Sequence, residues 1–153
     1  MRVLLFVHFV GQCLWIGGAV AAMVMALAAR REPVEVRAGA FRLVAQVHAM
    51  VIGPGALLVV ASGVLLTMQF MGGDAMELMA APRIWVMQGA GLLGGLMVLF
   101  VGLPTAVKMG GLAVPDQTGA LSPQFEGLRK RQAIVSSIAA GLAFVALFVA
   151  VLL

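Results

Sequence analysis

The chain has 153 residues, of which 63% are hydrophobic and only 10% are charged. A soluble domain averages about 45–50% apolar and about 25% charged residues, so this composition excludes a water-soluble globule and makes lipid the solvent. The formal net charge of +4 does not indicate a nucleic-acid-binding protein, because basic residues of membrane proteins gather in cytoplasmic loops.

The hydropathy pattern predicts an all-α fold, a membrane-embedded four-helix bundle that forms a single transmembrane domain over residues 1–153. The predicted spans cover about residues 3–29, 41–69, 84–107 and 133–153. Each reaches the length of about 20 apolar residues that a bilayer crossing needs. The first run is longer than the apolar region of about 7–15 residues in a signal peptide, so we expect it to be a retained helix.

Charge and proline mark the breaks between these spans. The first ends at Arg30-Arg31-Glu32-Pro33, and Gly53-Pro54-Gly55 predicts a kink inside the second. The connection over 108–131 is expected to be the one sizeable loop, although Ser122-Pro123 is typical of a helix start, with a capping serine and proline at the first position. All six acidic residues fall in predicted loops, and the sequence shows no convincing internal repeat.

The distribution of basic residues predicts the orientation. Eight of the ten lie in the first and third connections, against two at the N-terminus and in the second connection. The positive-inside rule then places both termini outside (N-out/C-out). In a bacterium this describes a multi-pass protein of the inner membrane with the 69–83 connection in the periplasm and Trp85 at the outer interface.

One face of each span carries small and polar residues and is predicted to line the bundle interior, because such residues hold helices together in lipid. These residues are His8, Gly11, Gln12, Trp15, Gly18 and Ala22 on the first span, His48, Gly55, Ser62 and Gln69 on the second, Gln88, Gly91, Gly95 and Gly102 on the third, and Gln132, Ser136, Ala140 and Ala143 on the fourth. The Gly91-x-x-x-Gly95 spacing predicts a close helix approach.

His8 and His48 are the candidate cofactor-binding residues, because an ionisable side chain inside a span is a functional-site hypothesis by default. Imidazole ligates haem iron, copper or zinc. The alternative is a neutral histidine bonded to a neighbouring helix, for His8 to Gln88 or to a serine. Because His8 lies near the outer end of its span and His48 near the inner end, the two are not expected to ligate one metal together.

Two methionine pairs form a second candidate site. Met68 and Met71, and Met76 and Met79, are each three residues apart on the predicted periplasmic side. Thioether sulfur is a soft ligand that suits Cu(I), so His8 and these four methionines are the candidate metal ligands. The alternative is that methionine serves as flexible apolar filler.

Several function classes lack their signatures. The chain has no HExxH, GxSxG or phosphate-binding loop, so an enzyme is not favoured. The single cysteine, Cys13, rules out a disulfide within the chain. Carboxylates inside the predicted spans, which pumps and transporters commonly use, are absent.

The run from Phe6 to Gly18, with His8, Trp15 and Gly17-Gly18, resembles the opening helix of the copper-resistance D (CopD)-like membrane proteins. It is also similar to that of the HemJ-type protoporphyrinogen oxidases. The first resemblance implies copper handling across the inner membrane, and the second implies haem b binding and porphyrinogen oxidation. In either case His8 matches the first-helix histidine of the family.

The sequence therefore leads us to expect a CopD-like integral membrane protein of copper or haem-linked metal handling, with copper or haem b as the possible cofactor. Two alternatives stay open. One is a structural accessory subunit of a larger respiratory or photosynthetic complex, and the other is a haem b enzyme of the HemJ kind. The expected partners are the lipid bilayer and a larger membrane complex or a second copy of the chain, and not nucleic acid.

Overall fold

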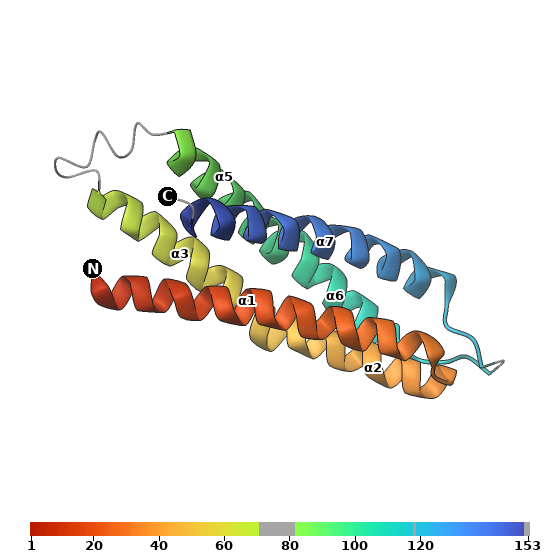
Figure 1. Cartoon of the computed structure of the whole chain (residues 1–153). Helices are drawn as coiled ribbons and strands as arrows, with labels where there is room; N and C mark the ends of the chain where they lie inside the picture. The colour runs from red at the N-terminus through yellow and green to blue at the C-terminus, as the bar shows by residue number, and fades with distance from the viewer. Residues whose placement is uncertain (71–81, 118, 152–153) are drawn as a thin grey trace.

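The computed structural model describes residues 1–70, 82–117 and 119–151 (Figure 1). Every regular element in these ranges is a helix. Four helical segments are long and apolar enough to cross a membrane: Arg2–Arg31, Val34–Gln69, Pro82–Gly111 and Pro123–Val151. The predicted all-α, four-helix membrane bundle is thereby confirmed.

Two of the four spans are single helices with simple ends, and two are divided. The first span consists of α1 (Arg2–Ala28) and a 3₁₀ turn, η1 (Ala29–Arg31), and the fourth is α7 (Pro123–Val151). The second span comprises α2 (Val34–Val47), η2 (His48–Ile52) and α3 (Gly53–Phe70). The third comprises α5 (Pro82–Met97), η3 (Val98–Gly102) and α6 (Leu103–Gly111).

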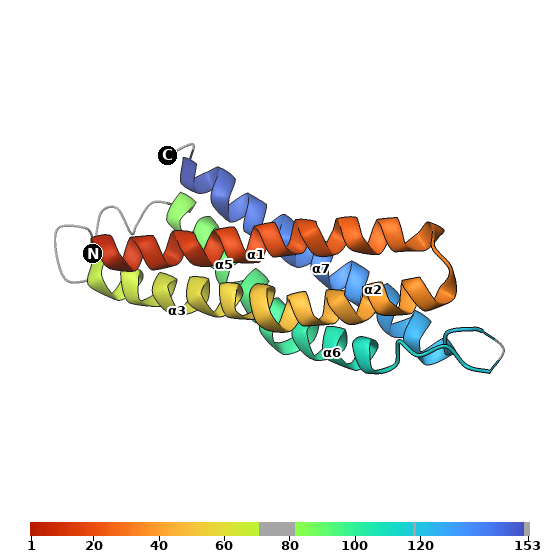
Figure 2. The ribbon, with the colours of Figure 1, turned by 90° about the horizontal axis from the view of Figure 1, so that it is seen from below.

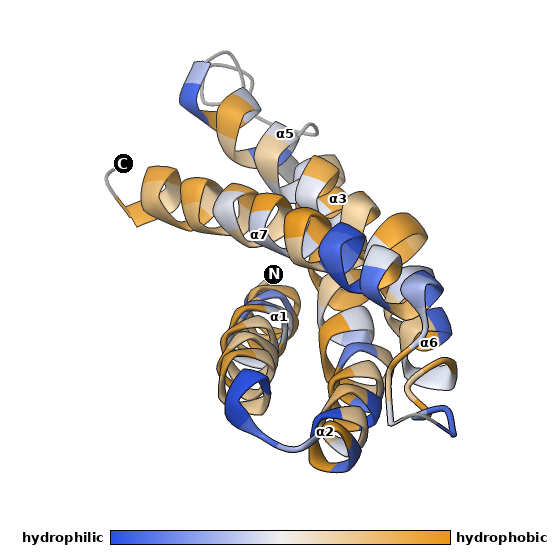
Figure 3. Cartoon of the chain, turned by 90° about the vertical axis from the view of Figure 1, so that its right-hand side faces the viewer, coloured by the Kyte–Doolittle hydropathy of each residue, from blue (hydrophilic) through white to orange (hydrophobic). Residues whose placement is uncertain are grey.

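The spans pair as two antiparallel hairpins. α1 packs mainly along α3, and α5 packs along α7, while contacts of α3 with α5 and of α2 with α6 join the hairpins (Figures 1 and 2). Met1 and the end of α7 lie at the same end of the bundle (Figure 1). Hydrophobic residues make up most of each helix, whereas hydrophilic residues gather at η1 and the starts of α2 and α7 (Figure 3).

The helices continue beyond the apolar stretches that the sequence marks. α2 begins at Val34 and α7 at Pro123, so the loop expected over 108–131 is reduced to the residues between Gly111 and Pro123. Hydropathy identifies only the part of a helix that lies in hydrocarbon, and the hydrogen-bonded backbone carries on into the interface. Two acidic residues expected in loops, Glu35 and Glu126, therefore lie in the first turns of α2 and α7, where a carboxylate is favourable near the helix dipole.

Proline and serine set two helix ends as predicted. Glu32 has extended backbone angles before Pro33, because proline disfavours a helical conformation in the residue ahead of it. At the start of α7, the Phe125 amide donates to the Ser122 hydroxyl oxygen at 3.2 Å. Ser122 thus caps the helix, and proline follows at its first position.

The second and third spans share a local feature, a π-helical turn followed by proline, which the sequence did not reveal as a repeat. Each has a single π-helical turn, η2 and η3, in which the Gly53 amide bonds the His48 carbonyl and the Leu103 amide bonds the Val98 carbonyl. A proline, Pro54 or Pro104, comes next in both. Since a proline lacks the amide donor and crowds the preceding turn, the wide turn accommodates its ring without ending the helix.

The predicted interior faces are largely confirmed. Trp15 is 1% exposed and lies in the core, with its ring against Gly94 and Gly95 of α5. On the second span, His48, Gly55 and Ser62 are buried, but Gln69 is exposed. Gln69 lies at the end of the apolar span, where its amide reaches the interface and needs no partner inside the bundle.

The closest helix approaches occur at glycines. A Cβ placed on Gly11 of α1 would lie 2.9 Å from the Gly55 carbonyl oxygen of α3, and one on Gly55 would lie 2.7 Å from the Trp15 nitrogen. A Cβ on Gly94 of α5 would lie 3.2 Å from the Ala139 carbonyl of α7, whereas one on Gly91 would meet only ordinary contact at 3.9 Å. A Cβ on Gly95 would clash with the Val60 side chain of α3. Of the predicted Gly91–Gly95 pair, only the second residue therefore lies at a tight crossing.

Candidate functional site

His8 lies in the first third of α1 and is part-buried against α3. Its Nδ1 lies 2.9 Å from the Ser62 hydroxyl oxygen, and the Ser62 hydroxyl donates to the Leu58 carbonyl of its own helix. A hydroxyl has one proton to donate. Since that proton goes to the carbonyl, the Ser62 oxygen accepts from His8, and the His8 proton sits on Nδ1. The other ring nitrogen, Nε2, then keeps its lone pair.

Two further residues shape the surroundings of His8. Gly63 lacks a side chain where the imidazole packs, and a Cβ there would lie 3.5 Å from His8 Cε1. Gln12 lies one turn further along α1, so its side chain shares a helix face with His8. Its Oε1 is buried, with no hydrogen-bond donor among the described residues. A water molecule or a metal-bound ligand beside His8 would satisfy this oxygen.

A second polar link joins the C-terminal end of α3 to the N-terminal end of α5. The Gln88 amide donates to the Thr67 hydroxyl oxygen at 2.9 Å, and Thr67 donates in turn to the Gly63 carbonyl at 2.9 Å. Gln88 was one predicted partner for His8. The structure instead gives His8 a serine, Ser62. A serine was the other predicted partner.

Of the four methionines in the two pairs, only Met68 lies in the described part of the chain. Met68 is 63% exposed, whereas Ser62, six residues earlier on α3, is 2% exposed and bonds His8. The described residues thus do not bring Met68 toward His8. Met71, Met76 and Met79 lie outside the described residues, so the two Met-x-x-Met pairs stay a prediction.

His48 lies in the π turn η2 and has both ring nitrogens occupied. Nδ1 lies 2.9 Å from the Val44 carbonyl oxygen. Because a carbonyl only accepts, the proton is on Nδ1. The Gln132 amide of α7 then donates to Nε2 at 2.8 Å and also contacts the Ser136 hydroxyl at 3.0 Å. This pair joins the second span to the fourth in the buried centre of the bundle.

A small central cavity adjoins His48. Its lining comes from all four spans and includes both π turns: Trp15, Ala19, His48, Ile52, Val98, Gly102, Val135 and Ser136. Its volume is about 10 Å³, close to the lower limit for holding one water molecule. The Gln132 Oε1 atom is buried and lacks a donor among the described residues. As packed, the site around His48 can admit a water molecule but not a haem.

The two histidines belong to separate sites. Ser62, which bonds His8, follows His48 by fourteen residues along one helical span. At a rise of about 1.5 Å per residue, this amounts to a separation of roughly 21 Å along the axis. Imidazole ligands must each come within about 2 Å of a metal. The geometry therefore agrees with the prediction that His8 and His48 do not share one ion.

The described residues contain no group of three or more histidine, cysteine or acidic side chains close enough to hold a metal ion. A metal at His8 would have to complete its coordination with amide, thioether, solvent or cofactor ligands. Comparison of the chain with protein-family models, with curated proteins and with solved structures found no match. The functional interpretation accordingly depends on the residues themselves.

Proposed function

We propose that this protein handles copper, or iron in haem b, inside a bacterial inner membrane, with His8 Nε2 as the imidazole ligand. The observation that carries the proposal is the hydrogen bond from His8 to Ser62. Metal-binding histidines almost always donate their second ring N–H to a fixed acceptor, which sets the tautomer and orients the ring. His8 has this arrangement, and its other nitrogen has the lone pair that a metal needs.

The contrast with His48 supports His8 as the proposed ligand. His48 would have to give up Gln132 before a metal could reach its Nε2, and the adjoining cavity is too small for a haem. The proposed site therefore includes His8 but not His48. The orientation proposed from the basic residues is N-out/C-out, which puts His8 near the periplasmic face.

A second candidate is a purely structural subunit of a larger membrane complex. One observation favours it: the bonds from His8 to Ser62, Gln88 to Thr67 and Gln132 to His48 each join two spans. Polar groups commonly hold helices together in membranes without any further role. In this case His8 would be a packing residue, and the protein would carry neither copper nor haem.

The absorption spectrum and metal content of the detergent-purified protein separate these candidates. A Soret band indicates haem and leaves the HemJ-like enzyme open, whereas stoichiometric copper in a colourless preparation indicates copper handling. Neither cofactor, together with co-purification of a large complex, would reject the proposal in favour of the structural subunit.

Two variants of Ser62 test the role of the hydrogen bond. Ser62→Ala removes the acceptor for His8 Nδ1, and loss of such an outer partner typically weakens metal binding about 10–100-fold. Ser62→Thr keeps a hydroxyl and should restore most of the affinity. Equal metal affinity in both variants would show that Ser62 does not orient a ligand.

The methionines can be tested separately. If the two pairs bind Cu(I), replacing Met68, Met71, Met76 and Met79 with leucine should abolish copper retention while the protein stays folded. Leucine preserves volume and apolarity, so the packing cost should stay under about 1.5 kcal/mol per site. Unchanged copper content would assign these four residues to apolar filling.

A further inference from the structure

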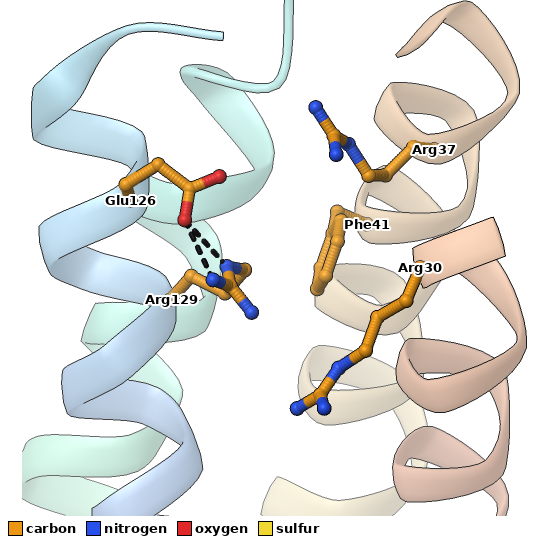
Figure 4. Close-up of a pocket in the computed structure, with 5 residues that line it drawn as sticks. All are labelled: Arg30, Arg37, Phe41, Glu126 and Arg129. Carbon is orange, nitrogen blue, oxygen red and sulfur yellow. Dashed lines mark hydrogen bonds and ion pairs between the residues drawn. The ribbon is translucent and has the colours of Figure 1, made fainter. Parts of the chain in front are cut away.

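A pocket lies at the basic end of the bundle, away from both histidines. It is lined by Arg30, Arg37, Phe41, Glu126 and Arg129 and has a volume of about 290 Å³ (Figure 4). One water molecule takes roughly 30 Å³ in the liquid, so the pocket can hold a polar group of several heavy atoms. Its walls come from η1, α2 and α7, the ends of three different spans.

The charge of this pocket is positive. Three arginines and one glutamate leave an excess of two positive charges. Glu126 is already neutralised, because its carboxylate contacts the Arg129 guanidinium at 2.7 Å and also accepts from Arg129 Nε at 2.8 Å. Arg30 and Arg37 form no ion pair with any described residue. They extend from the opposite side of the gap to Glu126 and Arg129, one on either side of Phe41 (Figure 4).

Arg37 gives an independent sign that an acceptor belongs in the pocket. Its Nε–H is buried and has no hydrogen-bond acceptor among the described residues. Buried donors in folded proteins nearly always have a partner. Guanidinium groups present a planar fork of donors that matches the oxygens of a phosphate.

The apolar wall suggests what carries the phosphate. Phe41 is only 3% exposed and lies between the two unpaired arginines (Figure 4). Its ring packs edge-on against the Phe125 ring, with 5.2 Å between the ring centroids. The pocket is at the boundary where the apolar spans end, the depth of lipid headgroups. Basic pockets between transmembrane helices on the cytoplasmic side commonly bind anionic headgroups, and the proposed orientation puts this end in the cytoplasm.

We propose that Arg30, Arg37 and Arg129 form a binding site for a phosphate group, supplied by the headgroup of an anionic phospholipid. The site is independent of the proposed metal function. The Glu126 carboxylate limits the positive charge of the pocket. A bound headgroup would link the turn between the first two spans to the start of α7 and so stabilise the bundle.

The proposed phosphate site can be tested by thermal unfolding of the purified protein in neutral detergent. The additives to compare are phosphatidylglycerol, phosphatidylcholine and inorganic phosphate. Phosphatidylglycerol should raise the melting temperature more than phosphatidylcholine does. Arg30→Gln and Arg37→Gln should each weaken the phosphatidylglycerol effect about fivefold in apparent affinity. Stabilisation by phosphatidylglycerol alone assigns the headgroup as the source, whereas equal stabilisation by inorganic phosphate supports the phosphate site but assigns free phosphate.

Neighbouring residues provide the matched controls. Arg31→Gln and Lys130→Gln remove the same charge at the same end but outside the pocket lining, and they should retain most of the lipid effect. Glu126→Gln should strengthen phosphate binding, a gain that a merely structural ion pair would not produce. The proposal is overturned if neither phosphate source stabilises the protein. It is also overturned if the control variants lose the effect as much as the pocket variants do, or if Glu126→Gln weakens binding.

Discussion

The two histidines of this protein lie in opposite halves of the bundle and differ in what their second nitrogen does. His8 uses Nδ1 to hold Ser62 and keeps a lone pair on Nε2, while His48 has Val44 on one nitrogen and Gln132 on the other. His8 is part-buried beside a glycine, whereas His48 is 5% exposed and lies in a π turn. If His8 is the proposed ligand, the comparison teaches that the hydrogen bonds of a histidine inside a span distinguish a ligand from a structural link.

The largest expected difference between the two halves is their accessibility from outside the cell. In a Cys13→Ala background, a cysteine at Gly73 should react with a membrane-impermeant thiol reagent on intact cells, and one at Ala120 should not, because the proposed orientation keeps the basic connections in the cytoplasm. Labelling after cell lysis controls for reactivity. The reverse pattern would invert the proposed orientation and move His8 to the cytoplasmic side.

The next largest effect is the loss of stability when each histidine is replaced, and it should be larger for His48, the more buried of the two. His48→Leu should lower the free energy of unfolding by about 1–3 kcal/mol, because a Gln132 donor is left buried without its acceptor. His8→Leu should cost about 0.6 kcal/mol, the average for a hydrogen bond between membrane helices. Denaturation of both variants in one detergent measures the difference, and equal losses would remove the distinction between the two sites.

Helix spacing near His8 gives a comparable test with a matched control. Gly11→Ala places a methyl group 2.9 Å from the Gly55 carbonyl oxygen, and such overpacking costs about 1–3 kcal/mol. Gly17→Ala on the same helix meets nothing within 4 Å and should be neutral or stabilising. If both alanines are tolerated equally, α1 and α3 are not held together at this crossing.

Much of the fold could be predicted from the sequence, because lipid imposes simple rules on composition. The number of spans and most of the interior faces follow from hydropathy and from the spacing of residues such as Trp15 and Ser62. The helix ends could not be placed as well, since charged residues at the start of α7 continue a helix whose apolar part begins later. The π turns were missed because Pro54 and Pro104 look alike whether they kink a helix or follow a wide turn.

The candidate site was predictable only in part. The sequence singled out His8 and His48 and favoured His8 alone as a metal ligand. It could not identify their partners, because Ser62 lies 54 residues from His8 and Gln132 lies 84 residues from His48 along the chain. Gln132 and Ser136 were expected on an interior face without a named partner. The arginine pocket was missed, since Arg30, Arg37 and Arg129 lie far apart in the sequence and meet only when the ends of three spans assemble.

The central claim is that His8, and not His48, holds the cofactor, and the most direct measurement is the cofactor content of purified His8→Ala and His48→Ala. Copper or haem per folded protein should fall to background in His8→Ala and stay near the wild-type value in His48→Ala. Because the second variant is expected to be less stable, its folded fraction should be measured in the same sample. Retention of the cofactor by His8→Ala, or its equal loss from both variants while they remain folded, would contradict the account.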